Sequence, residues 1–497
     1  MTAAPAIAAR TGMPSGLRVL IALGLPLVGA VTVIGIYLDK EFIVAAAWFA
    51  FSAAGAVLVE PMIGVLTITA MFLVAAYPTV LQDLGVLTIS NLLGLCLAVV
   101  LVAYVLRTRD LSFLTRRQVL IFLAIGILLV LSTAHANVIF PTMQASQSLG
   151  VKGKLLDRTS DMMHDFWVRL GFLVFFCAFV RSRRDVNGVF LTFMLVLFLA
   201  VPSALVDWWN GTLAHGFRAV ASVTAGTNAN RLAMICLMEI ACWWFWLHER
   251  PGSLRWAIAV AAIGGAFVVV LATGSRSGLV GVGVLAVLLQ TGPRRYRASA
   301  VQIAAVALAG VIAVATIVPT EAWERMVSFS TDDPHAVGAS SLIKREDTIQ
   351  IGMRMIRDHP FLGVGLGNYR EVSRQVYLDE YFRPPHNSYI WAASEGGLLV
   401  LGGYLLLWFV TWRELRLVMR LAGREPRLLH VSAALRVIFL LYAAFAALAD
   451  LFLNPITYVL IGLIITMRRY LESLPARTPV VAMPARRAAV PRRAFAR

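Results

Sequence analysis

The sequence predicts an all-α polytopic membrane protein, and three observations support this fold class. The chain has 497 residues, of which 59% are hydrophobic and only 14% are charged. Soluble domains carry about 25% charged residues, so the composition is that of a membrane protein. Its mean hydropathy is +0.78. Apolar runs of roughly 17 to 25 residues recur along the chain, and runs of this length form helices that cross a ~30 Å hydrocarbon core.

We expect about 12–14 transmembrane helices, because about fourteen apolar runs are candidates and some are short for a span. Glu60 and Pro61 alone separate the second run from the third, which predicts either a tight helical hairpin or one broken element. The first run is longer than a secretory signal core and lacks a small-residue cleavage site, so we interpret it as a span. The candidate runs are 17–38, 42–59, 62–77, 91–106, 118–134, 166–180, 188–206, 232–247, 255–273, 278–291, 299–318, 388–411, 431–449 and 454–467.

The distribution of basic residues predicts the orientation of the chain in the membrane. Short loops rich in arginine remain in the cytoplasm. If the N-terminus is cytoplasmic, every strongly basic short loop falls on the same side, together with the arginine-rich C-terminal tail. Both termini are therefore expected in the cytoplasm. The basic loops are 107–117, 181–184, 250–255, 294–297, 413–427 and 468–469.

Neither the net charge nor the cysteines indicate another class of protein. A net charge of +17 would suggest nucleic acid in a soluble protein, but here the loops and the tail account for it, and we expect no nucleic-acid partner. The four cysteines lie in apolar runs without metal-ligand spacing, and we interpret them as small buried hydrophobic residues. They are Cys96, Cys177, Cys236 and Cys242.

One long polar segment interrupts the series of apolar runs and sets the domain organisation. We expect membrane helices over 1–318, a large outer loop over 319–387, further membrane helices over 388–470 and a basic disordered tail over 471–497.

Two features of the outer loop have a structural interpretation. Its stretch SLIKREDTIQIGMRMIRD predicts an amphipathic helix with Ile349, Met353 and Ile356 on one face, ended by Pro360. The motif GVGLGNY (363–369) follows no strand, so we interpret it as a tight turn rather than a nucleotide-binding loop.

Several arginines lie where the expected outer loops meet the spans. Such residues run against the charge bias of the outer face, so each needs a partner or a function. Arg218 and Arg231 flank the segment GTNAN, and Arg276 follows a Gly-Ser turn between two apolar runs. A guanidinium presents a planar fork of donors that suits a diphosphate. For Arg231, snorkelling to lipid headgroups is an equally good interpretation.

The expected amphipathic helix carries further basic residues. Arg345, next to Lys344, lies near its N-terminus, a position that favours anions. Arg354 and Arg357 lie further along, where a solvated helix face is the better interpretation.

His386 and Asn387 lie directly before an apolar helix and after two prolines that fix the approach of the chain. The ordinary pKa of histidine, near 6.5, allows His386 to accept a proton from a hydroxyl group at neutral pH. A structural cap on the helix is the alternative. Glu395, about two and a half turns further on, either orients a neighbouring arginine or takes part in helix packing beside Gly396 and Gly397.

Glu239 is the one acidic residue near the middle of an expected span. A carboxyl group at this depth is typical of an ion-coupled transporter, so transport of small anions or lipid-linked sugars is the alternative function. A hydrogen bond to a neighbouring helix explains it equally well. The outer face shows no pattern of metal-binding carboxylates, and we expect no metal and no cofactor.

Four motifs in a fixed order resemble the O-antigen ligase family, which includes O-antigen polymerases. They are RA-x6-G-x-NAN, TGSRSG, KRE-x10-RDHPFLGVGLGNY and HNSYI-x4-EGG, and they span roughly residues 210–410. The resemblance implies a GT-C-like helical membrane glycosyltransferase. Such an enzyme moves a glycan from a polyprenyl diphosphate to an acceptor hydroxyl, inverts the anomeric centre and uses no metal.

The resemblance also implies roles for individual residues. By position, Arg218, Arg276 and Arg345 resemble the family's essential arginines, which would bind the diphosphate, and His386 resembles its essential histidine. Asn387 and Glu395 would support the site. The implied location is the bacterial inner membrane, with the site facing the periplasm. The acceptor stays open between lipid A core, a second glycan repeat and a protein side chain.

Overall fold

The computed structural model describes residues 41–74, 89–140, 154–223, 228–249, 252–327, 339–379 and 383–475. Within these ranges the regular elements are helices, apart from one isolated β-bridge between Ala214 and Arg218. The first half contains α3 (Glu41–Val59), α4 (Pro61–Leu73), α6 (Ile89–Thr108), α7 (Arg117–Ile139), α9 (Lys154–Phe179), α10 (Arg183–Phe198), α11 (Ala200–Trp209) and α12 (Ala229–Leu247). The second half contains α13 (Ser253–Ala272), α14 (Arg276–Gln290), η3 (Arg294–Tyr296), α15 (Ala300–Thr316), α16 (Thr320–Val327), α17 (Ala339–Asp358), α18 (Tyr369–Gln375), α19 (Ser388–Leu421), η4 (Ala422–Arg424), η5 (Pro426–Leu428), α20 (Leu429–Ala446) and α21 (Pro455–Ser473).

The predicted class, a polytopic helical membrane protein, is confirmed. In the described ranges, 6 helices are long and apolar enough to cross a membrane, and three shorter apolar helices accompany them. Large apolar side chains face outward, with Val138 75% exposed and Val301 78% exposed, as expected where lipid replaces water. The expected first span at 17–38 and the tail after residue 475 lie outside the described residues.

Local breaks in the helices follow from the sequence. Glu60 has extended backbone angles and Pro61 starts α4, so the second and third apolar runs form two helices rather than one. Leu199 keeps helical backbone angles between α10 and α11, and the two helices together form one candidate span, Arg183–Trp209, over the expected span at 188–206. Gly397 interrupts α19 with a φ of 73°, a conformation that side chains with a Cβ disfavour.

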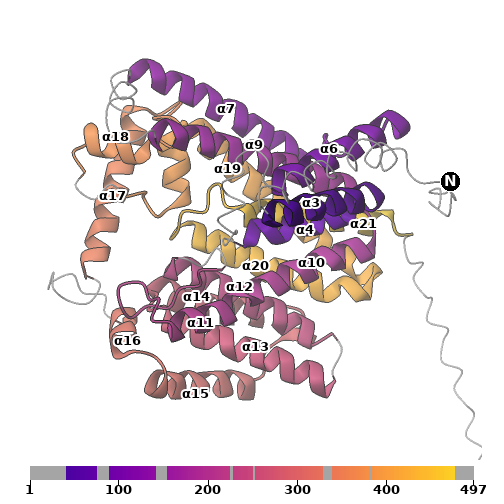
Figure 1. Cartoon of the computed structure of the whole chain (residues 1–497). Coiled ribbons are helices and arrows are strands. Elements are labelled where there is room, and N and C mark those ends of the chain that lie inside the picture. Colours follow the sequence, from indigo (N-terminus) through magenta and orange to yellow (C-terminus); the bar gives the residue numbers. More distant parts are fainter. Residues whose placement is uncertain are drawn as a thin grey trace, which may run out of the picture.

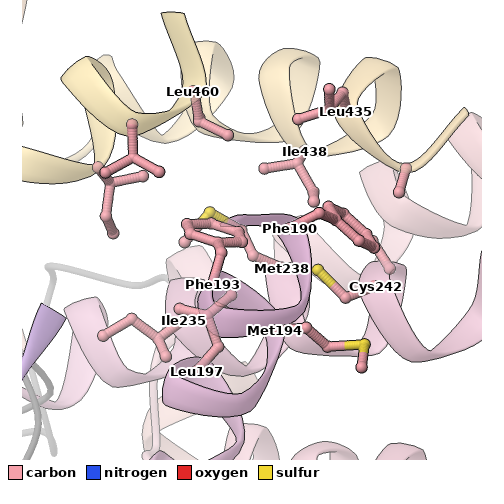
Figure 2. Packing of buried hydrophobic residues seen from close by; sticks show 14 of the residues in the cluster. Phe190, Phe193, Met194, Leu197, Ile235, Met238, Cys242, Leu435, Ile438 and Leu460 are labelled. Atoms are coloured by element: carbon pink, nitrogen blue, oxygen red, sulfur yellow. The ribbon is translucent and has the colours of Figure 1, made fainter. Parts of the chain in front are cut away.

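The main hydrophobic core lies where α10, α12, α20 and α21 meet (Figure 2). The side chains of Phe193, Met238 and Ile438 are buried between these helices. Cys177, Cys236 and Cys242 are buried and Cys96 is partly buried, and all four are free thiols. The cysteines therefore have the packing role predicted from the sequence.

Ion pairs bring basic loops together at one end of the bundle. Arg181 lies 3.5 Å from Asp110, and Arg183 lies 3.8 Å from Glu425. These contacts join three of the basic loops. The helices α12, α14 and α19 begin at the other end, which we call the polar end, and run toward the basic loops.

The outer-loop segment contributes α16, α17 and α18, which gather along one edge of the molecule (Figure 1, left). The predicted amphipathic helix is α17, but the predicted packing face is wrong. Met353 is 55% exposed, whereas Met355 is fully buried and Ile351 nearly so. Gly352 explains the difference, because its missing side chain lets this face of α17 approach Ile390 of α19 closely.

Candidate active site

Four arginine side chains come together at the polar end: Arg218, Arg276, Arg325 and Arg345. Three of them are arginines that the sequence singled out. The fourth, Arg325, lies on the short helix α16 and was not singled out. We call these four residues the arginine cluster.

A tight turn presents Arg218 to the cluster. The backbone N–H and C=O groups of Ala214 and Arg218 bond to each other at 2.9 and 3.0 Å, and Gly216 within the turn has a φ of 80°. The Arg218 side chain is buried. Its Nε donates to the carbonyl oxygen of Thr273 at 2.7 Å, and its Nη2 donates to Oδ1 of Asn230 at 2.9 Å. Arg218 therefore joins the start of α12 to the end of α13.

Arg276 is the first residue of α14, and the Ser275 side chain caps this helix by accepting from the N–H of Gly278. The Ser275 hydroxyl also donates to Oδ1 of Asn230 at 2.9 Å. The Arg276 Nε donates to the backbone carbonyl of Arg325 at 2.9 Å, which attaches α16 to the start of α14. Two arginines of the cluster are thus held in place through Asn230 and through α16.

The charges of the cluster act on one another. Burial and then the positive charges of Arg325, Arg345 and Arg276 lower the pKa of Arg218 to about 9. Burial and the charges of Arg276 and Arg345 lower the pKa of Arg325 to about 10. Burial also lowers the pKa of Arg345, while the negative charge of Asp450 acts in the opposite direction. Burial is the largest cause of each of these shifts, and the neighbouring positive charges add to it for Arg218 and Arg325.

His386 forms a pair with Asp450, a residue that the sequence did not single out. The Nδ1 atom of His386 lies 2.9 Å from Oδ2 of Asp450. The Ser388 hydroxyl fixes the loop that carries Asp450, since it donates to the carbonyl oxygen of Ala449 and accepts from the N–H of Leu451. The other ring nitrogen of His386, Nε2, is not part of this pair, so one nitrogen is oriented by a carboxylate and the other is left for a reacting group.

The backbone at His386 is strained, with a φ of 49°. Residues other than glycine rarely adopt this conformation, which costs on the order of 1–3 kcal/mol and persists only where the surroundings enforce it. Buried Pro384 and Pro385 precede it, and Asn387 follows it as the cap of α19. The structural cap that the sequence offered as an alternative role is therefore filled by Asn387, whose Oδ1 accepts from the N–H groups of Tyr389 and Ile390.

Glu395 anchors the glycine-rich turn. Its carboxylate accepts from the N–H of Gly367 at 2.9 Å and from the N–H of Tyr369 at 3.1 Å. Gly363, Gly365 and Gly367 all have positive φ values, which confirms the tight turn predicted there. The Glu395 carboxylate therefore holds the backbone of the glycine-rich turn.

Arg231 and the exposed arginines of α17 differ in their surroundings. Arg354 and Arg357 are exposed, as the solvated-face interpretation predicted. Arg231 lines a cavity of about 300 Å³ at the polar end, together with Arg169, Trp391 and Asp450.

A second cavity, of about 290 Å³, is almost entirely apolar and adjoins the arginine cluster. Ala219 and Ala272 line it, and the N–H of Ala219 donates to the carbonyl oxygen of Ala272 at 3.0 Å. These two residues are the chain neighbours of Arg218 and Thr273, so the apolar cavity begins next to the backbone of Arg218 and of Thr273. Leu205, Trp208, Trp209, Val268 and Ile317 complete much of its wall.

Glu239 is fully buried in α12 and lines neither of these cavities. Within the described ranges, no group of three or more His, Cys, Asp and Glu side chains gathers as a metal site would require. At the polar end, the arginine cluster and the His386–Asp450 pair bring charged side chains together.

These features define a polytopic helical membrane protein whose polar end combines an arginine cluster with a histidine–aspartate pair. Residues 259–405 match the family model described as O-Antigen ligase. The matched segment contains Arg276, Arg325, Arg345 and His386. A comparison with curated proteins found no match.

Proposed function

We propose that this protein is a membrane glycosyltransferase that moves a glycan from a polyprenyl diphosphate carrier to an acceptor hydroxyl. One observation carries the proposal: four guanidinium groups converge beside both a histidine–aspartate pair and an apolar cavity. A polyprenyl-diphosphate glycan offers the matching chemistry, because it joins a long apolar chain, a diphosphate and a sugar. The family match supports a transferase of this kind.

The arginine cluster would hold the donor diphosphate. Guanidinium groups bind phosphate oxygens through paired, charge-assisted hydrogen bonds. Positive charges held close together at fixed positions stabilise the negative charge that develops on the leaving diphosphate, without reorganisation at the moment of reaction. The adjoining apolar cavity would take the first units of the polyprenyl chain, reached sideways from the bilayer.

His386 would act as the general base. Its Nε2 takes the proton of the acceptor hydroxyl while the hydroxyl oxygen attacks the anomeric carbon of the donor sugar. The bond from this carbon to the diphosphate oxygen breaks, and the diphosphate leaves with the electron pair. Attack opposite the leaving group inverts the anomeric centre. Asp450 fixes the tautomer of His386 and stabilises the imidazolium ion that forms.

We place the polar end in the periplasm and both termini in the cytoplasm of a bacterial inner membrane, in a GT-C-like architecture. Short loops rich in arginine stay in the cytoplasm. The arginine-rich loops of this chain meet at the end of the bundle opposite to the polar end, which supports this orientation. The acceptor stays open between lipid A core and a second glycan repeat. A deletion strain separates these two, since loss of all lipid A-attached chains indicates a ligase and accumulation of single repeats indicates a polymerase.

The proposed activity is tested with purified protein, a polyprenyl-diphosphate glycan and a saccharide acceptor in the presence of EDTA. The expected result is a glycosylated acceptor and free polyprenyl diphosphate, formed at the same rate with and without the chelator. Absence of transfer with both acceptor types, or uptake of substrate into proteoliposomes that depends on Glu239 and not on His386, would overturn the proposal in favour of transport.

A further inference from the structure

The cavity of about 300 Å³ lined by Arg231 and Asp450 is separate from the arginine cluster, and its chemistry is different. We propose that this cavity binds the terminal sugar ring of an uncharged acceptor saccharide, with Trp391 as its stacking surface and Arg231 as a hydrogen-bond donor to its hydroxyl groups. The inference rests on the proposed glycosyl transfer and adds to it the place and the chemical class of the acceptor.

The charges that line the cavity are balanced. Asp165 and Arg169 form an ion pair with each other, and Asp450 is paired with His386. Arg169 also donates to the carbonyl oxygen of Leu453 at 2.5 Å. The arginine cluster, by contrast, places four cations together. A diphosphate therefore favours the cluster, whereas a polar but uncharged ligand suits the balanced cavity.

Two lining residues of the cavity have unused hydrogen-bonding capacity, Arg231 as a donor and Oδ1 of Asp450 as an acceptor. The Arg231 guanidinium makes no hydrogen bond or ion pair with any side chain or carbonyl in the described parts of the chain. A guanidinium offers five N–H donors in a planar fork, and adjacent hydroxyl groups on a sugar ring provide matching acceptors. Arg231 lines the same cavity as Asp450, so its donors face a space that a ligand can enter.

Trp391 supplies the apolar part of the cavity. It lies one turn into α19 from the cap residue Asn387. The backbone N–H of Trp391 donates to the backbone carbonyl oxygen of Asn387 at 2.9 Å. Phe452 packs against it edge to face, with ring centroids 6.2 Å apart. Stacking against the flat face of an indole suits the C–H groups of a pyranose ring, and the amide of Asn454 and the carboxylate of Asp165 provide polar groups at its rim.

The first turn of α12 lies between the cavity and the arginine cluster. Asn230, on the first turn of α12, accepts from Arg218 of the cluster, and the next residue, Arg231, faces the cavity. Successive residues on a helix point about 100° apart, so the first turn of α12 supplies both places. Asp450 likewise lines the cavity, and its negative charge partly opposes the lowering of the Arg345 pKa that burial causes. A sugar in the cavity therefore lies beside the His386–Asp450 pair, with the donor diphosphate on the other side of this turn.

The experiment measures acceptor KM and kcat, together with donor affinity, for Trp391→Ala, Trp391→Tyr, Arg231→Ala and Arg231→Lys in purified, folded protein. Lipid A core and a lipid-linked glycan repeat serve as the two acceptor probes. We expect both alanine variants to raise the acceptor KM at least tenfold with little change in donor Kd, and both conservative variants to recover most of the loss. Trp256→Ala and Arg354→Ala, which alter exposed residues outside the lining of the cavity, serve as matched controls.

Two results would overturn the inference while leaving the proposed function intact. One is an acceptor KM within twofold of wild type in both alanine variants. The other is an increase in donor Kd as large as the increase in acceptor KM, which would place Arg231 in the diphosphate site. Absence of transfer by the wild-type protein, in contrast, contradicts the proposed function itself.

Discussion

His386 and Asp450 are 64 residues apart in the chain, yet their side chains meet at 2.9 Å. The meeting depends on two helix boundaries, because His386 immediately precedes the cap of α19 and Asp450 lies in the turn between α20 and α21. A histidine held by a carboxylate keeps its proton on the nitrogen that faces the carboxylate. Its other nitrogen is then an acceptor, as a general base requires.

Asp450→Asn should therefore abolish most of the glycan transfer while the protein stays folded. The asparagine amide can donate to Nδ1, which moves the imidazole proton to Nε2 and removes the acceptor. General bases contribute about 10²–10⁴-fold to a rate, so we expect a loss of kcat in this range. The measurement is the initial rate of transfer at saturating donor. Exposed Asp161→Asn is the control, and equal rates for the two variants would contradict the role of Asp450.

Arg325→Ala should weaken donor binding, although no pattern in the sequence indicated a role for this residue. Each charge-assisted hydrogen bond contributes roughly 1.5–3 kcal/mol, so loss of one corresponds to a 10-fold to 150-fold increase in donor Kd. Arg325→Lys should restore part of the affinity, because lysine keeps the charge but not the planar fork. Arg357→Ala, on the exposed side of α17, should leave the affinity unchanged. A donor Kd for Arg325→Ala equal to that of Arg357→Ala removes Arg325 from the site.

Donor affinity should fall as the pH rises through about 9, the pKa to which burial and the neighbouring arginines lower Arg218. Deprotonation removes a positive charge, whereas the charge of a diphosphate diester stays constant in this range. The affinity is therefore complete at pH 7 and reduced at pH 10. Titration calorimetry with the donor at several pH values measures the effect. Arg218→Gln should bind weakly with a flatter pH dependence, and a wild-type affinity that is equal at pH 7 and pH 10 contradicts the prediction.

Gly397→Ala should destabilise the protein strongly, since the φ of Gly397 is 73° and an added Cβ would overlap the carbonyl oxygen of Phe361. The left-handed conformation alone costs roughly 1–2 kcal/mol for a residue with a Cβ, and the overlap adds to this cost. Gly402→Ala, in the same helix but with open space around it, should be neutral or slightly stabilising. Thermal unfolding in detergent compares the two variants, and similar melting temperatures would show that the turn against α19 can move aside.

Local pattern predicted the elements of this fold well. Hydropathy predicted a helical membrane protein. Pro61 starts a new helix, and the glycines at 363, 365 and 367 form a tight turn, as predicted from these residue types. The packing face of α17 was not predictable in the same way. The close approach at Gly352 depends on Ile390, which belongs to another helix and is not visible in the periodicity of α17.

The same distinction applies to the candidate site. Arg218, Arg276 and Arg345 stood out because arginine is unexpected where spans meet the outer loops, and the structure brings them together. Asp450 and Arg325 did not stand out. An aspartate between two spans and an arginine in a short polar helix are ordinary in isolation, and only the tertiary contacts with His386 and Arg276 give them significance.

The central proposal is that the arginine cluster binds the donor diphosphate and that the His386–Asp450 pair carries out proton transfer. Measuring donor binding and single-turnover transfer in His386→Ala and Arg276→Ala tests it most directly. His386→Ala should bind the polyprenyl-diphosphate glycan with wild-type affinity and transfer almost none of it. Arg276→Ala should lose donor affinity by at least tenfold. The account is contradicted if folded His386→Ala transfers the glycan at the wild-type rate, or if Arg276→Ala binds and transfers the donor as well as the unaltered protein.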